Sequence, residues 1–338
     1  MYTLIYFYTF ITYKMTSKIF EVFDSHHHIW SNGDEKYPWV VEPINELKEN
    51  STIESYIAST NSESSNRVQV HAFNEYETKI IKSLIVQPLN HKFDHSYLFH
   101  ALNSYPDKFL GMGLASPDEG VIGLRQLKEA APKNFVGVRF NPALFPGGNM
   151  DSELAGDMFE EASNLNLVVG VMCFKGIKDH VPALTKWAAK YENLKIIIDH
   201  MGFFRQPAVG AVVDKNDIIH NDEQHWNALL SLSNLKNIYV KISALFRLSG
   251  EPFPHNDLVK DKRIATLIQK FGAERLMWGS DWPYVMTGNQ TGMSDFAVKN
   301  LTEKCRVFER WNENEHQFSD EVIHQVMFQT ARDTFKIQ

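Results

Sequence analysis

Eight short apolar runs rich in β-branched residues recur along the chain, and stretches with helical periodicity fill most of the gaps between them. This alternation is typical of parallel sheets, because two parallel strands need a long crossover connection, which is usually a helix. The runs cover residues 19–26, 83–88, 108–116, 135–142, 167–174, 194–202, 237–245 and 275–283. The 338 residues suffice for one barrel of roughly 250 residues with insertions. We therefore predict an α/β fold, a single (β/α)8 TIM barrel.

Local signals place helices in the connections. Ser152 is an N-cap candidate after the fourth run, and Gly272 is a C-cap candidate before the last one. Two connections are long, residues 30–82 and 202–237. Barrel active sites lie at the carboxyl ends of the strands, so we expect long loops over this C-terminal face, the second covering the substrate. We also expect an amphipathic helix over residues 321–335 to pack against the barrel.

The amino-terminal segment does not continue this pattern. Residues 1–14 are apolar and aromatic, but no basic residue precedes Lys14, as a secretory signal requires. They also fall short of the ~20 apolar residues of a membrane span. We expect residues 1–18 to be an extension outside a barrel domain of residues 19–338, with Met15 opening the mature chain. A poor signal or an interfacial anchor is the alternative.

Charge and cysteine content exclude several classes of partner. The formal net charge is -7, which provides no basic surface for nucleic acid or an anionic membrane. The two cysteines, Cys173 and Cys305, are far apart in sequence and indicate no disulfide framework, which fits a reducing compartment. We therefore expect a cytoplasmic protein that acts on a small molecule, and we leave a homo-oligomer open.

Three consecutive histidines stand where the first run ends: His26 is its last residue, and His27 and His28 follow it. Side chains alternate between the two faces of a strand, so His26 and His28 share one face with Asp24. In a barrel one face points inward and the other toward the helices. We predict that His26 and His28 lie side by side at the barrel mouth and that His27 faces the helix layer.

Two further residues end strands at the same level. His200 follows the apolar residues of the sixth run, and Asp281 ends the eighth run just before Pro283. The first and eighth strands of a closed barrel are neighbours. We therefore expect His26, His28, His200 and Asp281 to converge on one point.

Five ordered motifs resemble those of the amidohydrolase-related family: "DSHHHIW", "GVRFNP", "IIIDHMG", "YVKISAL" and "FGAERLMWGSDWP". The resemblance runs from about residue 23 to residue 335 and is strongest to the branch of sugar-acid lactonases and 2-pyrone-4,6-dicarboxylate lactonase. It implies a TIM barrel of the metal-dependent hydrolase type. It also implies hydrolysis of a cyclic ester, or decarboxylation as in a sister branch.

The same resemblance limits the metal site. The wider superfamily adds a lysine from strand four and a histidine from strand five, whereas this chain has Arg139 and Cys173 near those positions. A two-metal site is therefore not expected. We favour a reaction that requires no cofactor, and the alternative is a single zinc held by His26, His28 and Asp281.

In the metal-free mechanism, Asp281 is the general base for water while His26, His28 and His200 polarise the lactone carbonyl. The substrate would be a sugar-acid or dicarboxylate lactone. Arginines that could bind its carboxylate and aromatic residues that could stack on its ring are Arg139, Arg205, Arg247, Trp30 and Tyr284. The alternatives are a zinc-dependent decarboxylase and a non-catalytic barrel, which would be expected to lose these four catalytic residues.

Overall fold

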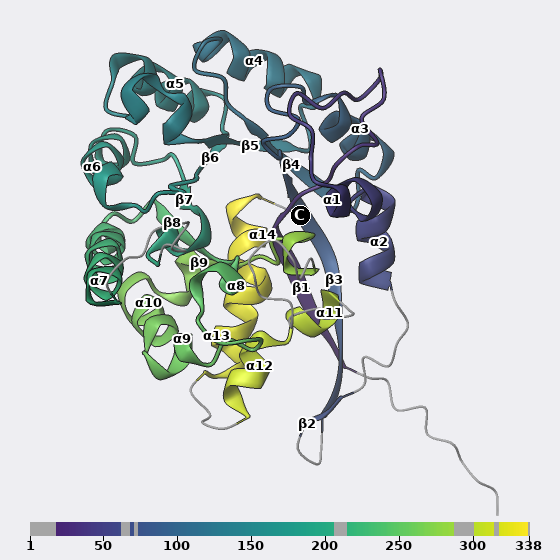
Figure 1. Ribbon diagram of the computed structural model, residues 1–338, viewed down its shortest axis with the longest axis vertical. Coiled ribbons are helices and arrows are strands. Elements are labelled where there is room, and N and C mark those ends of the chain that lie inside the picture. Colours follow the sequence, from purple (N-terminus) through teal and green to yellow (C-terminus); the bar gives the residue numbers. More distant parts are fainter. Residues whose placement is uncertain are drawn as a thin grey trace, which may run out of the picture.

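Eight parallel strands form the ring of a nearly closed barrel in the computed structural model, which describes residues 18–61, 68–70, 74–205, 215–286, 301–313 and 318–336 (Figure 1). Each strand pairs with the next along the chain. The ring consists of β1 Lys18–His27, β3 Asn74–Val86, β4 Phe109–Leu114, β5 Phe135–Phe140, β6 Val168–Val171, β7 Ile196–Ile198, β8 Ile238–Ile242 and β9 Leu276–Trp278. All eight lie within or overlap the predicted runs, so the predicted TIM barrel is confirmed.

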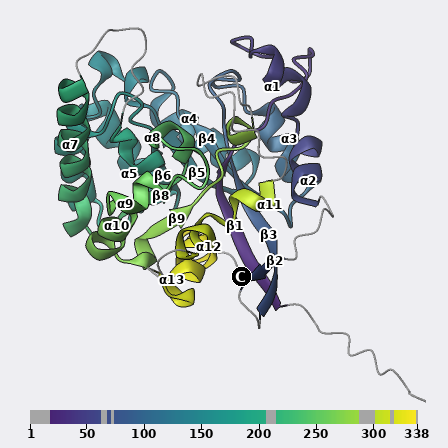
Figure 2. The same cartoon turned by 60° about the horizontal axis from the view of Figure 1, so that its bottom comes forward.

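The strand β2, Val68–Val70, is an addition to the ring and pairs antiparallel with β3. β1 and β3 are 10 and 13 residues long and extend past the other strands toward β2 (Figure 2). The predicted amino-terminal extension lies outside the described residues apart from Lys18, where β1 begins.

The ring closes between the chain after β9 and the end of β1. His27 and Trp282 form an isolated parallel bridge, and the main-chain N–H of His28 donates to the Trp282 carbonyl over 2.8 Å. The N–H of Asp281 donates to the carbonyl of His26, also over 2.8 Å. These bonds bring Asp281 beside the histidines of β1, as the strand order predicts.

Helices surround the ring (Figure 1). The longer ones in the connections are α2 Ile53–Asn61, α3 Ser96–Ser104, α4 Gly120–Ala130, α5 Glu153–Asn164, α6 Val181–Lys190, α7 Lys215–Ser231 and α10 Arg263–Phe271. Shorter ones are α1 Asn45–Asn50, α8 Leu245–Leu248, α9 Asp257–Lys260, α11 Leu301–Lys304 and α12 Val307–Asn312. None of the described helices is both long and apolar enough to cross a membrane.

The predicted caps are present. The Ser152 side chain accepts a hydrogen bond from the N–H of Ala155 in the first turn of α5, which provides a partner for one of the free donors there. Gly272 ends α10 with φ of 79°, a left-handed conformation that glycine adopts without a steric penalty. These local signals therefore fix two helix ends that the sequence predicted.

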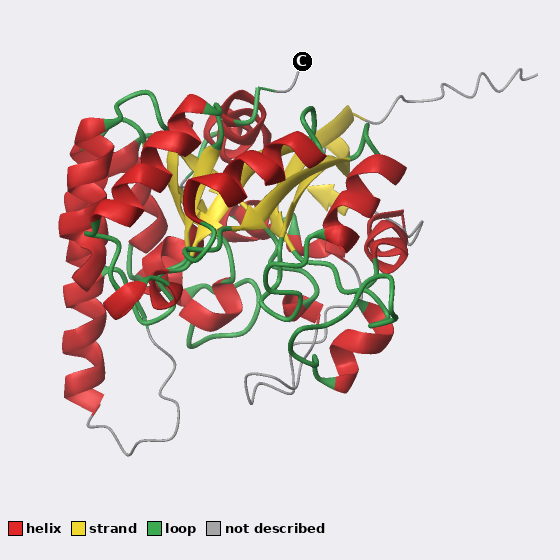
Figure 3. Ribbon diagram, turned by 90° about the horizontal axis from the view of Figure 1, so that it is seen from above, coloured by secondary structure: helices red, strands yellow, loops and turns green. Residues whose placement is uncertain are grey.

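The carboxyl-terminal helical segment closes the amino end of the barrel. It consists of α13 Asp320–His324, a π-helical turn over Gln325–Gln329, and α14 Thr330–Thr334, so the predicted single helix contains a bulge. Phe335 stacks on Phe23 inside the ring with ring centroids 5.7 Å apart. Loops gather at the opposite end, below the strands in Figure 3. This is the end at which the strands finish, and the polar residues predicted at the strand ends lie there.

Candidate active site

The segment at the end of β1, residues 26–28, directs two of its three histidines toward the same point. The Nε2 atoms of His26 and His28 lie 3.3 Å apart. His27 faces the helix layer, where its ring stacks on Tyr56 of α2 at a centroid distance of 3.8 Å. The structure therefore places all three histidines on the predicted faces.

Asp24 is on the other face from the one predicted. Its carboxylate accepts a hydrogen bond from the Tyr56 hydroxyl over 3.0 Å, so it lies on the helix side with His27. The pairing of β1 with β3 is irregular between Asp24 and His27, and this bulge shifts the alternation by one residue. The carboxylate also accepts from the N–H and the hydroxyl of Ser280, which attaches β1 to the segment after β9.

His26, His28 and Asp281 form a compact group whose ligand atoms fit a metal ion. The Oδ1 atom of Asp281 lies 3.3 Å from Nε2 of His28 and 3.8 Å from Nε2 of His26. Ligands of a tetrahedral zinc ion, each about 2.0–2.1 Å from the metal, lie about 3.3–3.4 Å from one another. The three atoms are thus spaced nearly as three corners of such a site. Among the described residues, the group does not extend to Cys173.

Buried partners orient both imidazoles from behind. Nδ1 of His28 is 2.7 Å from the carbonyl oxygen of Val86, which can only accept, so Nδ1 carries a proton. Nδ1 of His26 faces two charged groups, Nζ of Lys241 at 3.1 Å and Oδ1 of Asp199 at 3.4 Å. Lys241 and Asp199 lie within the motifs "YVKISAL" and "IIIDHMG", but the sequence predicted no role for either residue.

His200 and Asp281 share an uncommon backbone conformation. Their φ angles are 52° and 57°, in the left-handed region that few non-glycine residues occupy. Such strain is concentrated at functional sites. The ring of His200 lies 4.5 Å from that of His26, and its Nδ1 is 2.8 Å from the hydroxyl of Ser243. Both predicted strand-end residues therefore reach the histidine cluster.

The surroundings determine which groups are charged. Burial lowers the pKa of His200 to about 4 and that of His26 well below its ordinary value, so both imidazoles are neutral at pH 7. Burial alone would raise the pKa of Asp281, but His200, His28 and His26 lower it below 3.8. The site thus combines an ionised carboxylate with neutral imidazoles, the forms in which both bind metals.

A cavity of about 620 Å³ opens above this cluster. His28, His200 and Asp281 form part of its lining, whereas His26 is fully buried and does not contribute to it. Several other residues at the ends of strands and in loops line it, including Arg139, Arg247, Tyr284, Cys173, Phe174 and Lys175. Burial raises the pKa of the Cys173 thiol, which therefore stays protonated and is a poor nucleophile.

The cavity contains two guanidinium groups. Arg139 is only 1% exposed, its Nη2 donates to the carbonyl of Gln87 over 2.6 Å, and its Nε has no hydrogen-bond partner among the described residues. No described carboxylate lies within ion-pair distance of Arg139. Nε of Arg247 lies 3.8 Å from Oδ2 of Asp281, and its guanidinium stacks over the ring of Tyr284. Positive charge therefore remains available for an anionic ligand.

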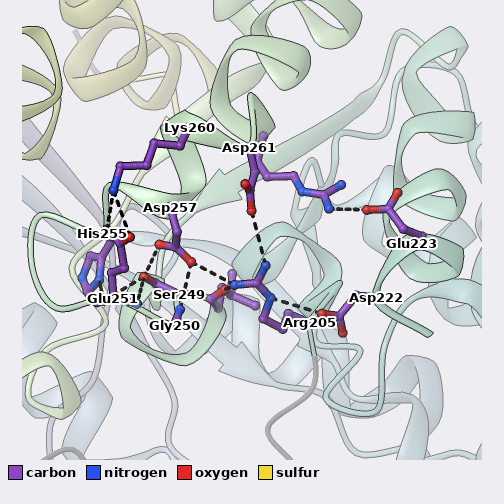
Figure 4. A network of polar contacts seen from close by, with 12 residues as sticks. Arg205, Asp222, Glu223, Ser249, Gly250, Glu251, His255, Asp257, Lys260 and Asp261 are labelled. Atoms are coloured by element: carbon purple, nitrogen blue, oxygen red, sulfur yellow. Dashed lines mark hydrogen bonds and ion pairs between the residues drawn. The ribbon is translucent and has the colours of Figure 1, made fainter. Parts of the chain in front are cut away.

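Two of the predicted substrate ligands do not line the cavity. Trp30 is buried, donates from Nε1 to the side chain of Asn90, and meets Tyr284 edge-on behind the cavity wall. Arg205 forms ion pairs with Asp222 at 3.1 Å and Asp257 at 3.0 Å, and it donates to the carbonyl of Leu248 (Figure 4). The Arg205 guanidinium therefore holds loops together rather than facing the cavity.

The chain belongs to the amidohydrolase family, whose model matches residues 23–337. It is 34% identical over 106 residues to L-fucono-1,5-lactonase of Burkholderia ambifaria, about 31% of each chain. It is 27% identical over 207 residues to 4-sulfomuconolactone hydrolase of Rhizobium radiobacter, 61% of this chain and 62% of that one. The chain thus matches less than two thirds of the length of either relative.

Solved structures show the same fold. A probable 2-pyrone-4,6-dicarboxylic acid hydrolase from Acinetobacter baumannii with citric acid bound superposes with a TM-score of 0.67 at 19% identity, over 94% of this chain and 99% of that one. An amidohydrolase from Burkholderia multivorans with bound zinc gives a TM-score of 0.64 at 17% identity, over the same shares. The predicted family membership is confirmed.

Proposed function

We propose that this protein is a hydrolase that opens the cyclic ester of a small lactone bearing a carboxylate. The observation that carries the proposal is one cavity in which an ionised carboxylate, Asp281, and two imidazoles lie beside Arg139, a buried guanidinium without a carboxylate partner among the described residues. The first three groups are suited to activating water and an ester carbonyl. The guanidinium is suited to a substrate carboxylate. The names of the two relatives, a lactonase and a lactone hydrolase, agree with the opening of a lactone ring.

Asp281 would transfer the proton. Its Oδ1 faces the imidazoles while its Oδ2 lies toward Arg247. In the reaction, a water molecule gives one proton to the carboxylate, and its oxygen forms a bond to the lactone carbonyl carbon. The ring C–O bond then breaks, and the ring oxygen takes the proton from Asp281 to give a hydroxy acid. His200 lies at the edge of the cluster, where it would donate a hydrogen bond to the developing oxyanion.

His26, His28 and Asp281 would hold a single divalent cation. The metal-free reaction favoured on sequence grounds has no support in the geometry, since the three ligand atoms have near-tetrahedral spacing. When bound, such a cation supplies Lewis acidity at the carbonyl and lowers the pKa of water. The zinc in a solved relative of the same fold agrees with a cation site.

A lactone panel with and without metal tests this function. Purified protein would be stripped with chelator, reloaded with zinc, and assayed for proton release on a sugar δ-lactone, a pyrone dicarboxylate, a muconolactone and an uncharged lactone. We expect hydrolysis of the carboxylated lactones, restored by zinc. Release of carbon dioxide from an aromatic acid assayed in parallel, without lactone opening, would favour the decarboxylase instead. No turnover of any of these compounds in either form would contradict the lactonase and favour a non-catalytic barrel.

Arg139 tests the substrate class separately. Replacing it with methionine removes a charge-assisted contact of about 1.5–3 kcal/mol, so KM for a carboxylated lactone should rise roughly 10- to 100-fold. Arg139→Lys keeps the charge and should lose less. KM for an uncharged lactone should not change. An equal rise in KM for both lactones would mean that Arg139 does not bind the substrate carboxylate.

A further inference from the structure

The imidazole of His26 lies between a donor and an acceptor on the side away from the cavity. Its Nδ1 is 3.1 Å from Nζ of Lys241 and 3.4 Å from Oδ1 of Asp199, and these two partners are 3.2 Å apart. All three side chains are completely inaccessible to solvent. Neither carboxylate oxygen of Asp199 completes a hydrogen bond of good geometry within the described part of the chain. Asp199 therefore retains capacity to accept one.

A neutral imidazole carries one proton, so His26 can use only one of these partners fully at a time. If Lys241 donates to Nδ1, the proton of His26 is on Nε2, where it points to Nε2 of His28 at 3.3 Å. Nε2 of His28 can accept it, because the proton of that ring is on Nδ1, bonded to Val86. In this arrangement the N–H of each imidazole has an acceptor, but Nε2 of His26 has no lone pair for a cation.

The second arrangement is the one that a cation needs. The proton of His26 is then on Nδ1 and is donated to Asp199, while Lys241 keeps its ion pair with the same carboxylate. The Nε2 lone pairs of His26 and His28 now face each other across 3.3 Å, a repulsive contact unless a cation lies between them. A carboxylate behind a metal-bound histidine is a common means of fixing this tautomer.

We infer that Lys241 and Asp199 select the tautomer of His26 and so set the cation affinity of the site in opposite directions. Lys241 favours the metal-free form, and Asp199 favours the loaded form. Both are positioning residues that act through His26. The inference rests on the proposed cation site at His26, His28 and Asp281, and it adds two residues that control that site from the side away from the cavity.

Zinc affinity, measured by competition with a chromophoric chelator, tests the inference without an activity assay. Lys241→Met removes the donor to Nδ1 and leaves Asp199 to accept the His26 proton, so zinc should bind at least about 10-fold more tightly. Asp199→Asn removes the charged acceptor, so zinc should bind about 10- to 100-fold more weakly. Lys195→Met is the matched control, since Lys195 contacts the carbonyls of Asp333 and Thr334 at the other end of the barrel. It should leave the affinity unchanged.

A buried charge without its partner can unfold a protein, so two further measurements accompany the single variants. The double variant Lys241→Met with Asp199→Asn keeps the pair neutral and should return toward wild-type affinity. In the wild type, 15N NMR of labelled histidine should show His26 protonated at Nε2 without zinc and at Nδ1 with it. The His26→Asn variant identifies the signal.

The outcomes separate this inference from the function on which it rests. If wild type and Lys241→Met both fail to bind zinc, the cation site is wrong and the inference falls with it. If both single variants bind zinc within twofold of wild type, or if His26 keeps one tautomer throughout, the inference is wrong while the cation site stands.

Discussion

Asp24 and Asp281 are both buried at the end of β1, and the main chain of His26 contacts both of them. Its N–H donates to Asp24, and its carbonyl accepts from the N–H of Asp281. The two carboxylates nevertheless titrate in opposite directions. Burial raises the pKa of Asp24 from 3.8 to about 6, although Ser280 and Tyr56 donate hydrogen bonds to it. Three imidazoles outweigh the same effect at Asp281 and lower its pKa.

Because both carboxylates are buried, the difference between their pKa values comes from the neighbouring groups. Hydroxyl and amide donors around Asp24 join β1, α2 and the segment after β9, which is a structural task. Imidazoles around Asp281 keep it ionised within the cavity wall, which suits chemistry. The inward side of the end of β1 therefore serves the site, and the outward side holds the fold.

The largest effect is expected for Asp281→Asn. Asparagine keeps the size of the side chain and tolerates the left-handed φ of 57°, so the protein should fold. Loss of a general base typically slows turnover about 10²- to 10⁴-fold, so kcat should fall at least about 100-fold. Steady-state kinetics measures the turnover, and circular dichroism checks that the variant is folded. A folded variant with turnover near that of wild type would remove Asp281 from the mechanism.

The two inward histidines should come next. His26→Ala and His28→Ala each remove one corner of the three-ligand group, so zinc binding should weaken at least about 10-fold and most turnover should be lost. Chelator competition and lactone assays report the two effects independently. If either variant kept both wild-type zinc affinity and wild-type turnover, the inward side of β1 would not be the functional one.

His27→Ala should affect stability and not chemistry. Its ring stacks on Tyr56 and packs near Phe109, so truncating it leaves a cavity, but its two ring nitrogens have no hydrogen bond among the described residues to lose; we expect a cost of about 1–3 kcal/mol. Urea unfolding measures this loss, while kcat and KM should stay within about twofold of wild type. Selective loss of turnover in His27→Ala, with normal stability, would reverse the assignment of the two faces.

Much of this site could be predicted from the sequence, because its residues stand where apolar runs end. Period-two alternation separates His27 from its neighbours, and strand ends mark His200 and Asp281. The same alternation marks Lys241 as a residue that faces into the barrel. Lys241 stands two residues after Tyr239 and two before Ser243, so these three side chains share one face of the strand. Lys241 is the charged residue in an otherwise apolar strand. A buried ammonium group is costly unless a hydrogen-bonding or oppositely charged partner lies beside it inside the barrel.

Other features have no local signal. The bulge that turns Asp24 outward depends on how β1 pairs with β3, and no pattern within β1 contains that register. Arg205 stands on a loop and resembles a substrate ligand in sequence. Its partners Asp222 and Asp257 are 17 and 52 residues away and meet it only in the folded chain (Figure 4).

The smallest effect, and the direct test of the opening comparison, is the pH dependence of stability in Asp24→Asn. Between pH about 4 and 6 the native protein keeps a proton on Asp24 that the unfolded chain has lost. The native state then binds more protons, so this residue makes the protein less stable as pH rises through that window, by about 2–3 kcal/mol in total. Below about pH 4 the contribution of Asp24 to the free energy of unfolding is fully present. Above about pH 6 its loss is complete and no longer changes with pH.

Asparagine cannot ionise, and it mimics the protonated acid because the hydroxyls of Ser280 and Tyr56 can accept from its amide. The free energy of unfolding of Asp24→Asn, relative to wild type, should therefore rise by about 2–3 kcal/mol from pH 4 to pH 6 and then level off. Carboxylates with lowered pKa values, such as Asp281, contribute equally to both proteins and cancel in the difference. Urea unfolding at several pH values measures it, with the exposed Asp118→Asn as control. A flat or falling difference would mean that the hydroxyl and amide donors stabilise the ionised form of Asp24 enough to overcome burial, and that Asp24 and Asp281 differ in position but not in charge.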